Sequence, residues 1–195
     1  MGTELIGNPA YGAWTTVTDG LDRNSIVYSL GVGEDVSWDV ALIEKYGCNV
    51  YAFDPTPSSI QWIERQTLPE QFHFYPYGVL DFDGTAVFNA KGKQGNNNLS
   101  VNMFTGTALR LPVKRLATIM RELGHDHIDV LKMDIEGSEY AVIRDIRGIP
   151  VKQILVEMHN KTSKRMRYPL ARARLFARGY REVARRDEDH TFTHI

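Results

Sequence analysis

The sequence predicts a single α/β domain, residues 1–195, with a Rossmann-like, doubly wound sheet. Short apolar runs alternate with segments of helical period, which is typical of parallel strands covered by helices on both faces. The 195 residues are enough for one hydrophobic core and too few for two ordinary domains. The stretch "VYSLGVGEDVSWD", residues 27–39, runs from an apolar strand over two glycines into a helix-compatible segment. Such a junction places backbone N–H groups and a helix N-terminus around a ligand.

The first half of the predicted sheet rests on three apolar runs. Gly47 marks the end of the first helix, and Pro57 suits the first turn of the second, where its missing N–H costs little. In chain order we expect a strand over 26–32, a helix over 36–46, a strand over 49–53, a helix over 57–66 and a strand over 72–79.

The second half repeats the alternation and ends differently. Pro169 and Gly179 bound the last predicted helix. The final run, "YREVARRDEDHTFTHI", has two strand-like halves around a polar turn and predicts an antiparallel hairpin over 180–195. In order we expect a strand over 128–135, a helix over 139–146, a strand over 153–158, a helix over 168–178 and this hairpin.

Residues 81–114 interrupt the alternation and are interpreted as an insertion. The run "LDFDGTAVFNAKG" predicts a hairpin with Asp83 and Gly84 at its turn, and "KQGNNNLSVN" is polar and turn-prone. A loop of this composition beside the third strand is either a surface excursion or part of a substrate lid. On the second interpretation, Asn97, Asn98 and Ser100 bound the acceptor site.

Charge is unevenly distributed although the net charge is only -1. Residues 161–186 hold ten lysines or arginines against one acid, Glu182. This segment is either a solvated helical face or a basic wall beside a site for an anionic substrate. Few aromatics interleave with the basic residues, and no Asp/Asn-Pro-Pro-aromatic tetrapeptide follows the fourth strand, so we expect no nucleic-acid partner.

The sequence favours a cytoplasmic protein. Cys48 is the single cysteine, and "MGTELIGNPAYG" has neither the basic nor the apolar region of a signal peptide. No apolar stretch approaches the roughly 18 to 20 residues of a membrane span. We therefore expect no membrane association.

The glycine loop argues against a dinucleotide. Gly31 and Gly33 fit the start of a G-x-G-x-x-G pattern, but Val36 stands where the third glycine belongs. Glu34 and Asp35 would repel a pyrophosphate and would suit a ligand with a cationic end. A tight strand-to-helix turn needs glycine for steric reasons alone, so the pair by itself is weak support.

Asp54 follows the next strand, 21 residues after Gly33, where doubly wound folds place the acid that binds ribose hydroxyls. It could equally cap the helix that begins near Pro57. Together with the loop, it favours a ribose-containing ligand that lacks a pyrophosphate and carries a cation, which describes S-adenosylmethionine (SAM).

Further polar residues follow the fourth and fifth strands. Asp134 and Glu136 come after one buried strand, and Glu157 and His159 come at the end of the next. Carboxylates at this edge of a parallel sheet should face a cation, a metal or a substrate hydroxyl. For Glu139 we prefer a simple electrostatic role at the start of its helix.

Four segments together resemble one known family: "VYSLGVGEDVSWD", "AFDPTP", "VLKMDIEGSEY" and "ILVEMH" are similar to the FkbM-type SAM-dependent methyltransferases, of the class I Rossmann-like group. The likeness covers residues 12–158. It implies a mostly parallel seven-stranded sheet with an antiparallel C-terminal strand. It also implies O-methylation, often of a hydroxyl on a sugar or sugar-bearing metabolite. The expected partner is thus a small-molecule hydroxyl acceptor, anionic or glycosylated.

The resemblance also suggests roles for individual residues. It implies that Asp54 binds the ribose hydroxyls and that Asp134 lies at the methyl-donor end. The remaining cofactor residues that it implies are Gly31 and Gly33 beside the methionine and ribose, Ser29 and Asp35 as their neighbours, and Tyr77 and Gly78 beside the adenine.

Methyl transfer to a hydroxyl calls for a base. His159, assisted by Glu157 or Asp134, is the candidate because an ordinary histidine pKa of roughly 6.5 suits proton removal near neutrality. The alternative is a loop histidine bonded to the backbone. Glu136 is assigned to the acceptor. Asp134, Glu157 and His159 could instead hold Mg²⁺ or Mn²⁺, although we favour a metal-independent reaction.

Two other classes of function remain open. A nicotinamide-dependent dehydrogenase would share the Asp54 signal but lacks the third glycine. A noncatalytic SAM- or nucleotide-binding module would keep the loop without an aligned acceptor site.

Overall fold

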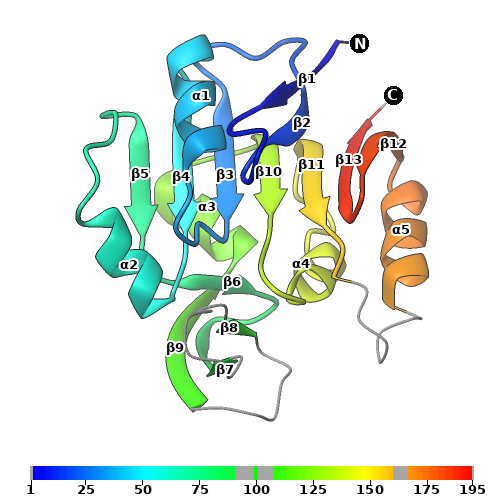
Figure 1. Ribbon diagram of the computed structural model, residues 1–195. Coiled ribbons are helices and arrows are strands. Elements are labelled where there is room, and N and C mark those ends of the chain that lie inside the picture. The colour runs from blue at the N-terminus through cyan, green and yellow to red at the C-terminus, as the bar shows by residue number, and fades with distance from the viewer. Residues whose placement is uncertain (1, 91–98, 101–107, 160–166, 195) are drawn as a thin grey trace.

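The computed structural model describes residues 2–90, 99–100, 108–159 and 167–194. Its centre is a seven-stranded sheet in which β13 alone runs opposite to the other six strands, which confirms the predicted fold class (Figure 1). Across the sheet the strands are β12 (Tyr180–Arg186), β13 (Asp189–His194), β11 (Val151–Glu157), β10 (Ile128–Met133), β3 (Ile26–Leu30), β4 (Asn49–Phe53) and β5 (Phe72–Tyr75).

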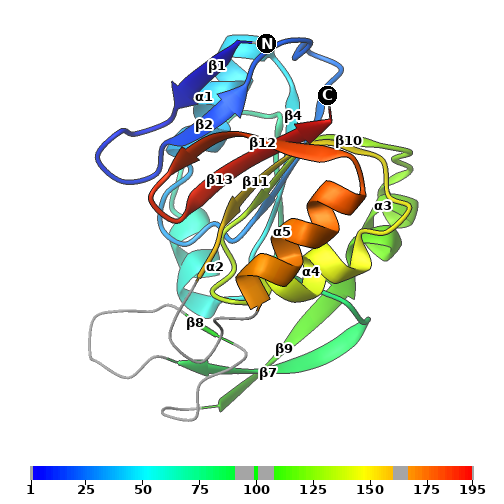
Figure 2. The same cartoon turned by 90° about the vertical axis from the view of Figure 1, so that its right-hand side faces the viewer.

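Helices cover both faces of this sheet. Apolar residues of β3, β4 and β10 alternate between the two faces and are fully buried on each, as expected for a sheet with no solvated side. One face packs against α1 (Ser37–Tyr46) and α2 (Pro57–Ile63). The opposite face packs against α3 (Leu116–Leu123), α4 (Glu139–Asp145) and α5 (Arg167–Ala177), which lie toward the right in Figure 2, with α1 and α2 on the left.

An N-terminal hairpin, which the strand–helix alternation does not predict, joins the side of α1. It consists of β1 (Thr3–Ile6) and β2 (Trp14–Val17). The Gln153 side chain ties it to the main sheet, because it accepts from the Val17 N–H at 3.0 Å and donates to the Val17 carbonyl at 2.7 Å. Residues 7–13 connect the two strands and reach the ligand edge of the sheet.

A second, four-stranded sheet lies beyond the carboxyl ends of the parallel strands (Figures 1 and 2). Its order is β6 (Gly78–Leu80), β9 (Ala108–Arg115), β7 (Gly84–Ala90) and β8 (Leu99–Ser100). The single strand predicted over 72–79 is therefore wrong: it is split at Pro76 into β5 and β6, which belong to different sheets. Proline has no N–H to continue a ladder.

The hairpin predicted at Asp83 and Gly84 is also wrong, because β9 lies between β6 and β7. The Asp83 carboxylate accepts from the Arg115 N–H and from the Thr118 hydroxyl, both at 2.8 Å. Asp83 therefore joins β9 and α3 to the link between β6 and β7.

The other predicted helices are present with ends shifted by a residue or two, except that α2 ends at Ile63 instead of Gln66. Helix α1 ends as predicted: Gly47 is left-handed, at φ 68°, and donates to the Ile43 carbonyl at 2.7 Å. Among the described helices, none has the length and apolar character needed to cross a membrane.

Candidate active site

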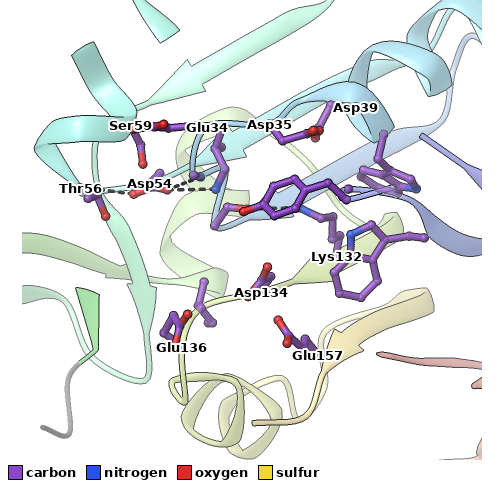
Figure 3. A pocket seen from close by; sticks show the side chains of 18 of the residues that line it. Glu34, Asp35, Asp39, Asp54, Thr56, Ser59, Lys132, Asp134, Glu136 and Glu157 are labelled. Carbon is purple, nitrogen blue, oxygen red and sulfur yellow. Dashed lines mark hydrogen bonds between the residues drawn. The ribbon is translucent and has the colours of Figure 1, made fainter. Parts of the chain in front are cut away.

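A cavity of about 480 Å³ opens at the carboxyl edge of the parallel strands (Figure 3). It lies where the sheet order reverses, since the chain proceeds from β3 to β4 on one side and has β10 on the other. Ligands of doubly wound folds bind at such a switch point. The loops after β3, β4, β10 and β11 line it, together with residues 11–14 of the N-terminal hairpin.

The two loop glycines serve different purposes. Gly31 has φ +82°, and a Cβ there would lie 1.8 Å from the Asp134 carbonyl oxygen, so the approach of two strand ends excludes any side chain. Gly33 has φ +59°, and a Cβ there would meet no atom within 4 Å. Gly33 therefore borders open space, as expected for a ligand loop.

Asp54 holds the glycine loop in place. Its Oδ2 accepts from the Val32 and Gly33 N–H groups, both at 3.0 Å, and its Oδ1 accepts from the Thr56 N–H at 2.8 Å. The side chain lines the cavity although the residue is only 5% exposed. Asp54 thus joins the loop after β3 to the start of α2, and its contact with ribose stays a prediction.

Two buried residues of opposite charge, Asp39 and Lys132, line the α1 side of the cavity. Lys132 Nζ donates to the Gly31 carbonyl at 3.1 Å and lies 5.5 Å and 5.8 Å from the ring centroids of Trp14 and Trp38. Asp39 is fully buried, and among the described residues neither of its carboxylate oxygens has a hydrogen-bond partner. Burial raises the pKa of Asp39, while the charge of Lys132 lowers it.

Ser29 lies in the same region. It is fully buried and its hydroxyl accepts from Lys132 Nζ at 3.4 Å, but it does not line the cavity. Asp35 does line the cavity, and its Oδ1 accepts from the Ser37 N–H at 2.7 Å. Tyr11 lines the cavity while 81% exposed, so its ring stands at the mouth.

Three carboxylates form a row across neighbouring strands. Met133 of β10 is in register with Val156 of β11, so Asp134 comes next to Glu157, and Glu157 is in register with Asp189 of β13. Like charges placed opposite one another repel. Burial raises the pKa of Glu157, and the charge of Asp134 raises it further, to about 8. Burial and Asp134 likewise raise the pKa of Asp189 to about 6.

His159 lies beside this row and is held by Glu139. Its Nδ1 is 3.0 Å from Glu139 Oε1, and its Nε2 is 3.5 Å from carboxylate oxygens of both Glu136 and Glu157. Burial lowers the pKa of His159, but the Glu139 hydrogen bond and the charges of Glu139, Glu157 and Glu136 outweigh it and raise the pKa to about 9. The glutamates around it therefore favour the protonated form of His159.

The comparisons with known proteins agree with this geometry. Residues 21–182 match the family described as the methyltransferase FkbM domain. This chain belongs to the FkbM methyltransferase family.

Curated relatives include the probable methyltransferase-like protein 24 of Homo sapiens, 29% identical over 120 residues, which are 62% of this chain and 27% of that protein. The protein of the same name from Rattus norvegicus is 27% identical over 159 residues, 75% of this chain and 38% of that protein. This chain thus spans well under half the length of these relatives. The solved fibrillarin pre-rRNA processing protein of Methanococcus jannaschii has the same fold, with a TM-score of 0.50 at 12% identity over 90% of this chain and 68% of that one.

The FkbM methyltransferase cavity gathers most of the residues predicted from sequence. Gly31, Gly33, Asp35, Asp54, Asp134, Glu136, Glu157 and His159 all line it. The His159 ring contacts Glu139, whereas one of the two interpretations has it bonded to the backbone; its role as the base stays a prediction, and the neighbouring glutamates raise its pKa.

Two predicted cofactor residues lie elsewhere. Tyr77 is not among the lining residues, because its ring packs against Phe53 and Tyr75, with centroids 5.6 Å and 5.8 Å away. Gly78 lies against Pro55 and Val113, where a Cβ would come within 3.2 Å and 3.3 Å of their side chains. Both residues serve packing where the two sheets meet.

The structure does not test the acceptor residues predicted in the 81–114 insertion. Ser100 belongs to β8, and Asn97 and Asn98 lie outside the described residues.

The most important residue missed by sequence reasoning is Glu139, to which the sequence gives only an electrostatic role at the start of its helix although the residue is fully buried. Its Oε1 accepts from the Ile135 and Gly137 N–H groups, both at 3.1 Å, as well as contacting His159. Asp189 was also missed, although an antiparallel strand that follows a turn begins at the ligand edge, and this would have indicated it.

Three side chains of the FkbM methyltransferase cavity lie close enough together to bind one metal ion. One ligand atom each from Asp134, Glu157 and His159 lies within 4.8 Å of the others. Carboxylate oxygens suit Mg²⁺ and Mn²⁺. A metal binds histidine through a neutral ring, so His159 would have to lose its proton when the metal binds.

Proposed function

We propose that this FkbM methyltransferase uses SAM and methylates a hydroxyl of a sugar or of a sugar-bearing small molecule. The observation that carries the proposal is a cavity at the sheet's switch point whose charged lining is mostly carboxylate. Its lining acids are Glu34, Asp35, Asp39, Asp54, Asp134, Glu136, Glu157 and Asp189, against the cations Lys132 and His159. Such a lining suits a ligand that brings positive charge and several hydroxyl groups.

The lining residues fit SAM at two points. Asp39 is a buried carboxylate whose oxygens have no hydrogen-bond partner among the described residues; an ammonium group would supply one, and Lys132 lies nearby to face a carboxylate. We therefore assign these two residues to the amino-acid end of SAM. Asp54 and the open side of Gly33 suit the ribose. When bound, SAM supplies a methyl group activated by a positively charged sulfur.

The base is assigned to the pair formed by Glu157 and Asp134. A pKa of about 8 places Glu157 close to working pH, where a general base is most efficient. The proton of the acceptor hydroxyl would pass to a Glu157 carboxylate oxygen. His159 keeps its own proton, and its charge, 3.5 Å from Glu157 Oε2, limits how far the Glu157 pKa rises. Because the two groups interact closely, they titrate as a pair.

A divalent cation on Asp134, Glu157 and His159 is the alternative within the same function. It would acidify the acceptor hydroxyl directly. Chelation separates the two: a metal-dependent reaction is abolished by a chelator and restored by Mg²⁺ or Mn²⁺, whereas the carboxylate base is insensitive to chelation.

The function is tested with SAM carrying a deuterium-labelled methyl group and a panel of sugars and glycosylated hydroxyl compounds. We expect labelled product and S-adenosylhomocysteine to form in equal amounts with at least one acceptor. A protein that binds SAM but methylates no member of the panel would favour the noncatalytic module. Binding of NADH in place of SAM would favour the dehydrogenase.

The fold likeness to a pre-rRNA processing protein is only 12% in sequence, so it indicates no acceptor. A small-molecule acceptor follows from the family resemblance. The free, buried Cys48 is compatible with the reducing cytoplasm proposed from the sequence.

A further inference from the structure

A second cavity, of about 350 Å³, lies between α4, α5 and the link from β6 to β7. Helices α4 and α5 pack side by side on the same face of the sheet (Figure 2). Three arginines line the cavity: Arg144 from α4, and Arg167 and Arg174 from α5. Arg167 and Arg174 belong to the basic segment 161–186, for which the sequence allows either a solvated helical face or a basic wall beside a site for an anionic substrate.

The arrangement on α5 concentrates charge on one face. Arg167, Leu170 and Arg174 follow at intervals of three and four residues, so they share one side of the helix. All three line the cavity. Arg144 forms an ion pair with Asp81, which is the only acid among the described lining residues. Three guanidinium groups against one carboxylate leave the cavity positively charged.

Ser138 provides the observation that separates this cavity from an ordinary basic surface. It lines the cavity, and the residue is only 5% exposed. Its backbone N–H donates to the Ile135 carbonyl at 3.1 Å, but among the described residues its hydroxyl has no hydrogen-bond partner. A buried hydroxyl without a partner is costly, and such a group calls for a ligand. An oxyanion would accept its hydrogen bond.

This cavity adjoins the methyl-transfer site through adjacent residues. Glu136 lines the first cavity, and Gly137, the next residue, lines the second. Tyr140 lines the second cavity and donates its hydroxyl to the backbone carbonyl of His159 at 3.2 Å. One molecule could therefore place an anionic group in the second cavity and a hydroxyl in the first.

We propose that the second cavity binds an oxyanion group, phosphate or carboxylate, carried by the methyl acceptor. The proposal rests on the methyl-transfer function above, which it narrows to anionic hydroxyl compounds. Guanidinium groups and a hydroxyl are the donors that proteins use for such oxyanions. Phe82 and Leu170, 43% and 51% exposed, also line the cavity and would contact the carbon skeleton of the acceptor.

The test is a titration of the whole protein with inorganic phosphate by calorimetry, at ionic strength held constant with chloride. The double variant Arg167→Gln/Arg174→Gln should bind phosphate at least about tenfold more weakly than the wild type. Ser138→Ala, which removes only one neutral donor, should weaken binding by roughly two- to tenfold. Arg147→Gln is the matched control, since it removes the same charge from an exposed position outside the cavity.

Acetate, titrated in parallel, distinguishes a carboxylate site from a phosphate site. Absence of phosphate and acetate binding, or equal weakening in Arg147→Gln, would overturn the proposal. A parallel SAM titration keeps the two claims apart. Anion binding without SAM binding would contradict the proposed function and leave an anion site that serves no methyl acceptor, whereas SAM binding without anion binding would contradict only the second site.

Discussion

Replacement of Asp54 tests how the glycine loop is held. In the wild type its two carboxylate oxygens accept three backbone N–H groups, from Val32, Gly33 and Thr56. Hydrogen bonds to charged groups are worth ~1.5–3 kcal/mol each. Gly33 is exposed and Thr56 is partly exposed, so water can replace their lost bonds, whereas Val32 is buried. We therefore expect Asp54→Ala to lower the free energy of unfolding by about 1.5–3 kcal/mol, mostly through the Val32 N–H.

Asp54→Asn should keep part of the stability that Asp54→Ala loses. Its amide oxygen can still accept from Val32 and Gly33, but its NH₂ group would face the Thr56 N–H. We expect a loss of about 1–2 kcal/mol. Because Asp54 orients the loop, SAM affinity should fall about tenfold or more in the alanine variant and less in the asparagine variant.

Urea denaturation measures the stability, and calorimetry on the folded variants measures SAM binding. Glu64→Ala, which removes an exposed carboxylate just after α2, is the control and should change neither quantity. A folded Asp54→Ala protein with an unchanged denaturation midpoint and unchanged SAM affinity would refute both the loop role and the ribose role.

Four further predictions follow from the buried charges. Glu139→Gln should lower the pKa of His159, because the first of the interactions that raise it is lost; an NMR titration of the imidazole with no downward shift would contradict the contact. Glu157→Gln should reduce methyl transfer by ~10²–10⁴-fold with SAM affinity nearly intact, and normal turnover in this variant would remove the proposed base. Asp39→Asn should raise the free energy of unfolding, because it removes the charge of a buried carboxylate that has no hydrogen-bond partner among the described residues and whose burial outweighs the attraction of Lys132, and it should weaken SAM binding; a variant that lost stability and kept its affinity would argue against the assignment. The wild-type free energy of unfolding should decrease as the pH rises from about 5 to about 9. The folded protein keeps protons on Glu157 and His159, whose pKa values of about 8 and about 9 lie well above their ordinary values, and the unfolded chain releases them earlier. A flat profile in urea melts, or equal slopes in wild type and Glu157→Gln, would count against these shifts.

The sheet could be predicted from sequence because its signals are local. Strand-length apolar runs, the glycines at helix ends and the spacing from Gly33 to Asp54 each depend on a few neighbouring residues. The four-stranded sheet could not, because β6 and β9 pair across nearly thirty intervening residues and no local pattern specifies that partner. Asp83 looked like a turn residue, but its carboxylate binds β9 and α3.

The candidate site could likewise be predicted where its signals are local, and not where they depend on tertiary packing. Residues that end parallel strands, such as Asp134 and Glu157, meet because the register places them side by side. Asp39 and Glu139 were not assigned to the site because their sequence positions are typical of the first turn of a helix, where acids are common. Their burial depends on tertiary packing. His159 was found by position, but its protonation depends on the three glutamates around it.

A crystal structure with S-adenosylhomocysteine tests the central claim most directly. We expect the ligand in the first cavity, with its ribose at Asp54 and Gly33 and its amino-acid end at Asp39 and Lys132. Its sulfur should face the carboxylates of Asp134 and Glu157. A ligand bound elsewhere, or one in the cavity with its amino-acid end away from Asp39 and its sulfur away from Glu157, would contradict the proposed site and its chemistry.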